Sequence, residues 1–345
     1  MTRAAGVRAR KDVIRLTDSI TSIGRADWTQ LVRGSCAPVF YSYDFLSSIE
    51  RHPLSRPSSA FYLVSRDRDD ALAAALVLYL QETADPFAPP GTGRTRMLVG
   101  HIWHCYDTTL MTARPLSPRL VAAFTEKVHS LAGELGAGPR GLVNVRLDGP
   151  LAAHMAAAGL ACQVTAPRYQ LRVPRTGLSL DSHLSGVGRS SRRSLRQYVR
   201  RAARAGVRIT FQDGGQSLDE AVLALCMATA DKHAPGYYPP GELSELILRL
   251  GPACRILRVE LDGTLLATSI SLLDEHRAHF WAGGSLYPKE FNWSPQYVLF
   301  AAEFEAGLAS GRGIIEFGRR NDEFKARYGL AAVPLARFVS SGGAS

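Results

Sequence analysis

The chain has 345 residues, of which 46% are apolar and 21% charged; this length and composition predict a globular protein of about two domains and exclude a disordered or fibrous chain. The longest apolar run, residues 71–80, is about half of the roughly 20 residues that a membrane-spanning helix needs. The first fifteen residues are basic and lack the apolar stretch of a secretory signal. We therefore expect a cytoplasmic protein without a membrane span.

Two features of the composition bear on its partners. Five of the 41 basic residues are lysines, and this arginine bias, together with abundant Ala and Gly, indicates a GC-rich bacterial genome. The five cysteines are dispersed and form no Cys-x-x-Cys pair, so we expect reduced thiols, mostly in the core, with neither a disulfide framework nor a metal site.

The predicted elements occur twice in the same order. The first series is a helix at 43–50, a hairpin at 63–80, a strand at 97–103, a helix at 117–135 and a strand at 141–146. The second series is a helix at 218–231, a hairpin at 256–273, a strand at 278–283, a helix at 294–310 and a strand at 313–317. A further helix and strand follow each series. Both long helices begin with Ser-Pro, which suits an N-cap followed by proline at the first helical position. The sequence thus predicts a duplicated α/β unit with domains at 1–173 and 174–345.

A run of arginines opens the second unit. No acidic residue lies between Asp181 and Asp213, whereas eight arginines do. On a helix over 189–206 six of them fall within an arc of about 120°, with Leu195 and Ala202 on the opposite side. The six are Arg189, Arg192, Arg193, Arg196, Arg200 and Arg204. A solvated helix face is the ordinary interpretation of such a run. The absence of acidic neighbours four residues away favours an anionic ligand instead, such as tRNA or a phosphorylated substrate.

Two segments carry a resemblance to a known group of proteins. Residues 311–329, GRGIIEFGRRNDEFKARYG, resemble the ending Phe-Gly-x-x-x-Asp-x-x-Lys-x-x-aromatic-Gly of double-GNAT proteins of the Fem-type aminoacyl-transferase and related acyltransferase families. Residues 190–207 resemble the Arg-rich helix that opens their second domain. Residues 40–50 and 86–98 are similar to the N-terminal half of the peptidoglycan biosynthesis and recognition group of that superfamily.

This resemblance implies an α/β fold made of a tandem pair of GNAT-like domains, with mixed, mostly antiparallel sheets flanked by helices. It also implies an enzyme that transfers an acyl group. Fem-type enzymes move an amino acid from aminoacyl-tRNA to an amine, typically on a peptidoglycan precursor, whereas other double-GNAT relatives use acyl-CoA.

The loop at 287–295 bears on the choice of donor. GNAT enzymes that use CoA usually carry a glycine-rich stretch here, whose bare N–H groups hold the pyrophosphate at a helix N-terminus. This loop has no glycine and contains two prolines. We therefore expect aminoacyl-tRNA, and no bound cofactor, more than acyl-CoA.

The resemblance also suggests site residues, each with an ordinary alternative. A bulge in the central GNAT strand exposes an N–H toward the acyl carbonyl, which places an oxyanion contact near Trp281 and Gly283, although Trp281 suits a core position equally. Lys325 holds the position of the motif's lysine and would neutralise charge on the substrate, if it is not a surface lysine. Asp322, three residues earlier, would orient Lys325 or cap a helix.

Further candidates would bind substrate. Arg319 and Arg320 suit phosphate recognition, or are edge charges. Tyr237, Tyr238 and His233 lie in a Pro/Gly loop and would line an acceptor pocket, unless they close that loop over the core.

The leading hypothesis is an amide-forming transferase that moves an aminoacyl group from aminoacyl-tRNA to an amine of a cell-wall precursor or peptide-type metabolite. The partners would be tRNA and an anionic acceptor, not DNA. The alternatives are an acyl-CoA-dependent N-acyltransferase and a non-catalytic double-GNAT protein that binds tRNA or precursor.

Overall fold

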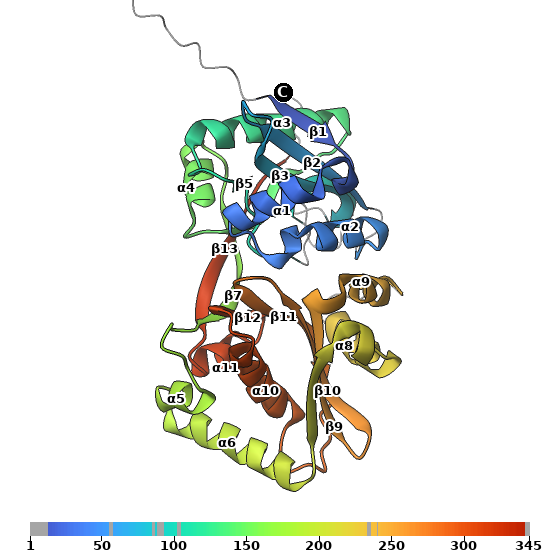
Figure 1. Cartoon of the computed structure of the whole chain (residues 1–345), viewed down its shortest axis with the longest axis vertical. Helices are drawn as coiled ribbons and strands as arrows, with labels where there is room; N and C mark the ends of the chain where they lie inside the picture. The colour runs from blue at the N-terminus through green and yellow to red at the C-terminus, as the bar shows by residue number, and fades with distance from the viewer. Residues whose placement is uncertain are drawn as a thin grey trace, which may run out of the picture.

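The computed structural model describes residues 13–54, 58–84, 87, 93–101, 105–232, 236–239 and 241–341. Two lobes follow one another along the long axis of the molecule (Figure 1). No helix in these ranges has both the length and the apolar character needed to cross a bilayer.

The first lobe is built from short helices and an antiparallel hairpin followed by a long helix. Its elements are β1 (Ile14–Thr17), η1 (Ile20–Ser22), α1 (Arg25–Gly34), η2 (Val39–Tyr41), α2 (Tyr43–Arg51), β2 (Ser58–Arg66), β3 (Leu72–Ala84), β4 (Arg94–Gly100), β5 (Met111–Thr112), α3 (Pro118–Glu134), β6 (Arg140–Arg146) and α4 (Pro150–Ala157). The predicted Ser-Pro start of α3 is confirmed, because the Ser117 hydroxyl accepts the amide of Leu120.

The remaining elements form the second lobe and the connection between the lobes. They are β7 (Gln163–Arg172), α5 (Leu180–Ser185), α6 (Arg189–Arg204), β8 (Arg208–Asp213), α7 (Gly214–Ser217), α8 (Glu220–Asp231), α9 (Glu242–Leu250), η3 (Gly251–Ala253), β9 (Cys254–Leu261), β10 (Thr264–Leu273), β11 (Arg277–Ser285), α10 (Pro295–Ala309), β12 (Ile314–Arg319), α11 (Asp322–Arg327) and β13 (Ala331–Ser340). Ser294 occupies the N-cap of α10 as predicted, although its side chain makes no capping bond.

The duplication is visible in the strand order. One sheet runs β1-β2-β3-β4-β6-β13-β7-β12-β11-β10-β9-β8, and β5 pairs with β3. In each lobe a hairpin leads to a parallel pair, β4 with β6 and β11 with β12. The last strand of each unit then pairs with the other unit: β7 is antiparallel to β12, and β13 is antiparallel to β6. Because β7 also pairs with β13, the two sheets are continuous.

Apolar packing fixes the lobes against each other. One buried cluster contains Trp28 and Tyr62 of the first lobe together with Leu246, Ile256 and Trp281 of the second. Separate clusters lie under α3 and α4, and under α6 and α10. Three of the five cysteines, Cys105, Cys226 and Cys254, are buried, and all five thiols are free. The prediction that most of the cysteines lie in the core is therefore confirmed.

Candidate active site

A cleft opens in the second lobe where two parallel strands separate. Residues Arg277–His279 of β11 pair with Ile314–Glu316 of β12. Both strands are described over their whole length, and they do not pair beyond these residues. The space between the diverging ends belongs to a cavity of about 490 Å³. Its walls come from β11, β12, α8, α10 and α11, with Tyr106 contributed by the first lobe.

Trp281 lies at an irregularity in the cleft wall. Ile270 on β10 faces Ala282, whereas Ser271 faces Phe280, so the register shifts by one residue and Trp281 is the extra one. The Trp281 side chain is 8% exposed and belongs to the core between the lobes while also lining the cleft. The bulge expected from the resemblance is therefore present at this strand.

Two glycines follow Trp281 and leave room for close backbone packing. A Cβ at Gly283 would lie 2.6 Å from the carbonyl oxygen of Thr268, and one at Gly284 would lie 2.2 Å from the carbonyl oxygen of Leu225. Both glycines line the cleft. Larger residues here would force β11 away from β10 or α8 and deform the wall.

Lys325 enters the cleft from α11. Its side chain is buried, and Nζ donates to the carbonyl oxygen of Arg319 at 2.8 Å. Burial lowers the pKa of Lys325 to about 8, although the carboxylates of Glu303 and Asp322 act in the opposite direction. The alternative prediction, that Lys325 is a surface lysine, is therefore wrong. The charge lies inside the cavity, where weak screening strengthens its effect on a substrate.

Glu303, on α10, interacts electrostatically with Lys325 and was not among the site residues predicted from the sequence. It lines the same cleft, and burial raises its pKa to about 7, while a hydrogen bond with Ser269 and the charge of Lys325 lower it. Its neighbours one turn away, Leu299 and Gly307, are buried. An acidic residue on the apolar side of the predicted helix 294–310 is the signal that could have identified it.

The first lobe contacts the end of β12, from which the chain leads into α11 and Lys325. The Arg319 guanidinium donates to Asn144 Oδ1 and lies 5.6 Å from the centre of the Tyr106 ring. Asn144 Nδ2 in turn donates to the carbonyl oxygen of Cys105 at 2.6 Å. Because the Arg319 carbonyl accepts the Lys325 ammonium, the first lobe fixes the cleft lysine through Arg319.

A buried arginine joins the lobes. Arg168 on β7 is 1% exposed and forms ion pairs with Asp107 of the first lobe and Glu316 of β12. Burial disfavours its charge, but the two carboxylates outweigh this effect and raise the pKa of Arg168. The pairing keeps the buried charge compensated, which a buried ion requires.

The other predicted residues divide between the cleft rim and positions beyond it. Arg320 is exposed at the rim, where it has φ of 67°, and Asp322 is exposed at the start of α11. Tyr237 and Tyr238 line the cleft, with ring centres 4.8 Å apart. His233 lies outside the described residues. The structure therefore brings seven of the predicted residues into one cavity: Trp281, Gly283, Lys325, Arg319, Arg320, Tyr237 and Tyr238.

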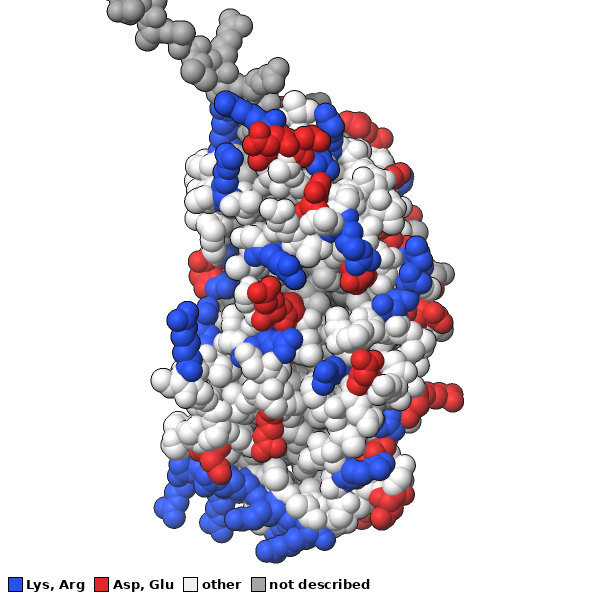
Figure 2. All heavy atoms as spheres, viewed as in Figure 1, with Lys and Arg blue, Asp and Glu red and all other residues white. Residues whose placement is uncertain are grey.

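The arginine face of α6 lies on the outside of the same lobe. Leu195 and Ala202 are buried, as predicted, and basic side chains cover the lower end of the molecule along α6 (Figure 2). Within the described part of the chain, Arg196 alone among the α6 arginines forms an ion pair, with Asp181 at 2.7 Å. Most of this positive charge is thus left for solvent or an external anion.

The start of α10 offers few amide groups to a phosphate. Pro295, at the first helical position, has no N–H, and the amides of Tyr297 and Val298 both donate to the carbonyl of Ser294. The preceding loop is tied to α6, because Arg201 Nη1 donates to the carbonyl of Asn292.

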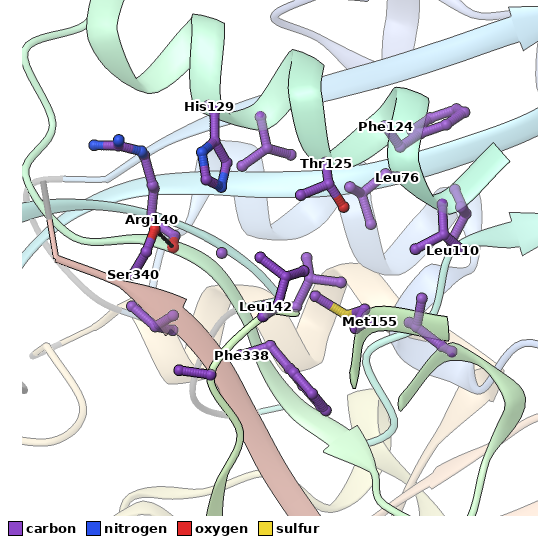
Figure 3. Close-up of a pocket in the computed structure, with 17 residues that line it drawn as sticks. Leu76, Leu110, Phe124, Thr125, His129, Arg140, Leu142, Met155, Phe338 and Ser340 are labelled. Carbon is purple, nitrogen blue, oxygen red and sulfur yellow. Dashed lines mark hydrogen bonds between the residues drawn. The ribbon is translucent and has the colours of Figure 1, made fainter. Parts of the chain in front are cut away.

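The first lobe has a cavity of a different kind. Apolar side chains of α3, β6, α4 and β13 enclose about 30 Å³, with His129 and Arg140 at one side (Figure 3). Phe338 of the exchanged strand β13 closes part of it. It is too small and too apolar to compete with the 490 Å³ cleft as a reaction site.

Known proteins share this architecture. The acetyltransferase (GNAT) domain family matches residues 189–326. The crystal structure of FemX is similar at 11% identity, with a TM-score of 0.62 over 94% of this chain and 97% of that one. A tandem GNAT protein from the clavulanic acid biosynthesis pathway, solved without AcCoA, is 15% identical, with a TM-score of 0.56 over 96% of this chain and 100% of that one.

A third similar structure is L-PGS from Bacillus licheniformis, at 11% identity and a TM-score of 0.52 over 93% of this chain and 92% of that one. No curated protein matches the sequence. The chain therefore has the double-GNAT, Fem-like fold, and the match to the acetyltransferase (GNAT) domain family lies in its second half.

Proposed function

We propose that this protein forms amide bonds by moving an aminoacyl group from aminoacyl-tRNA to an amine of a cell-wall precursor or peptide-type metabolite. The observation that carries the proposal is the arginine face of α6, which belongs to the lobe that also holds the cleft. Repulsion among these guanidinium groups is offset when a polyanion lies along them. The sparse amides at the start of α10 favour this donor over acyl-CoA, whose pyrophosphate needs them.

The cleft supplies the groups that amide formation requires. Glu303, with a pKa of about 7, accepts a proton from the acceptor ammonium and leaves a neutral amine. The amine attacks the ester carbonyl of the donor, and a backbone N–H at the Trp281 bulge donates to the developing oxyanion. The C–O bond to the tRNA ribose then breaks as the amide forms, and the ribose oxygen receives the proton that the attacking nitrogen loses.

Lys325 stabilises the negative charge that develops in this sequence. Its burial keeps the ammonium in a weakly screened environment, and its bond to the Arg319 carbonyl holds it at the cleft. Arg320, at the rim, would contact an anionic group of the acceptor.

The donor is tested by incubating the protein with mixed aminoacyl-tRNAs and a panel of amines. We expect an amide product whose formation is abolished by RNase. Turnover with acyl-CoA and no RNA would show the alternative N-acyltransferase, and tRNA binding without turnover in either assay would show a non-catalytic binder.

The salt dependence of tRNA binding tests α6 separately. The predicted face has six arginines, and Arg196 is already paired, so five contacts at about −0.7 each give a slope of log affinity against log salt of roughly −3.5. A flat response would remove α6 from the proposal.

A further inference from the structure

The loop between β11 and α10, residues 286–294, is anchored by contacts within itself and with α6. The rings of Phe291 and Trp293 stack at 4.9 Å with an interplanar angle of 8°, and Trp293 is 6% exposed. Arg201 of α6 binds the Asn292 carbonyl. The loop is therefore held in place by its own aromatic stack and by the basic helix.

One aromatic residue of this loop points away from the core. Tyr287 is 65% exposed although it also lines the cleft. The Lys232 ammonium, at the end of α8, lies 5.7 Å from the centre of the Tyr287 ring and lines the same cleft. A single exposed tyrosine is ordinary, but an exposed ring with a cation beside it at a cleft mouth presents a flat surface and a positive charge together.

Tyr287 lines the cleft and belongs to the loop that Arg201 of the basic helix contacts. Asn292, which Arg201 contacts, is five positions after Tyr287, so the two residues are at most about 18 Å apart even if the chain is fully extended. An RNA whose backbone follows α6 therefore comes within reach of Tyr287 before its end enters the cleft.

We propose that Tyr287 and Lys232 form a stacking platform for a base of the unpaired 3′ end of an RNA. This inference rests on the proposed use of aminoacyl-tRNA. The phenol ring stacks on the base, and the ammonium offsets the charge of a neighbouring phosphate. Stacking of this kind tolerates any base and adds to the contacts that arginines make with the backbone. The platform thus guides the 3′ end from α6 into the cleft.

The test uses Tyr287→Ala and Tyr287→Phe in the full chain, with deacylated tRNA and the same tRNA trimmed of its unpaired 3′ nucleotides as probes. We expect Tyr287→Ala to weaken binding of intact tRNA by roughly 5- to 150-fold, and Tyr287→Phe to bind nearly as well as the wild type. The wild type should lose affinity for the trimmed tRNA, and Tyr287→Ala should add little to that loss.

Arg193→Ala is the matched control, because Arg193 is exposed on α6. It should weaken binding of both probes equally and reduce the magnitude of the salt slope by about 0.7, whereas Tyr287→Ala should leave the slope unchanged. If the wild type binds tRNA but Tyr287→Ala binds intact tRNA equally well, or weakens both probes alike, the platform is refuted and the donor proposal stands. If the wild type binds neither probe, both are overturned.

Discussion

Glu303→Gln should abolish part of the pH dependence of stability. The pKa of Glu303 is about 7 in the folded protein, against its ordinary 4.5. Between these values the folded protein holds a proton that the unfolded chain releases, so the free energy of unfolding falls as the pH rises from 4.5 to 7. The difference between these two pKa values, at 1.36 kcal/mol per pKa unit, corresponds to about 3 kcal/mol in the free energy of unfolding. This value is an upper limit, because the cleft is open to solvent and solvent screens part of the electrostatic effect.

Urea unfolding of the wild type and Glu303→Gln across pH 4.5 to 7 measures this difference without any substrate. We expect the variant to gain up to about 3 kcal/mol relative to the wild type over this window. Glu305→Gln is the matched control, because Glu305 is exposed on the same helix, and it should follow the wild-type curve. Parallel curves for the wild type and Glu303→Gln would refute the raised pKa of Glu303 in the folded protein.

The other predictions concern the lysine, its support and the cleft wall. The pKa of Lys325 is lowered to about 8 from 10.5, so the unfolded chain binds its proton more tightly and the free energy of unfolding rises from pH 8 to 10.5; Lys325→Met should remove this rise in the same titration. Asn144→Ala leaves Arg319 without its acceptor and should cost about 2 kcal/mol in urea unfolding, with a larger loss in kcat than in substrate affinity in the transfer assay. Gly284→Ala places a Cβ 2.2 Å from a backbone oxygen of α8 and should cost about 1–3 kcal/mol, whereas Gly313→Ala, with nothing within 4 Å, should have little effect on the thermal midpoint.

The sequence alone was sufficient to predict the helices and hairpins whose residues carry strong local signals. Helices α3 and α10 combine apolar periodicity with a Ser-Pro start, and the β9–β10 hairpin turns at Asp262-Gly263. The repeated order predicted a duplicated α/β unit, and the tandem GNAT-like fold that the resemblance implied is confirmed. The exchange of β7 and β13 could not be predicted, because alternating apolar residues show that a segment is a strand but do not specify its neighbour.

Site residues were predictable where a motif or the composition of a loop indicated them, as the Pro/Gly loop did for Tyr237 and Tyr238. Lys325, Trp281 and Gly283 came from resemblance and line the cleft together. Glu303 and Asn144 belong to no motif, and their importance depends on contacts between segments far apart in the chain. Asn144 bonds to a residue 175 positions away, a distance over which no local pattern carries information.

The position of β13 has a consequence for synthesis on the ribosome. This strand is translated after every other strand of the sheet, yet it lies between β6 and β7 at the centre. Until it emerges, the nascent first lobe exposes the unpaired backbone of β6 and lacks Phe338 from its interior. Folding of the two units is therefore coupled once β13 has been synthesised, because this single segment completes both.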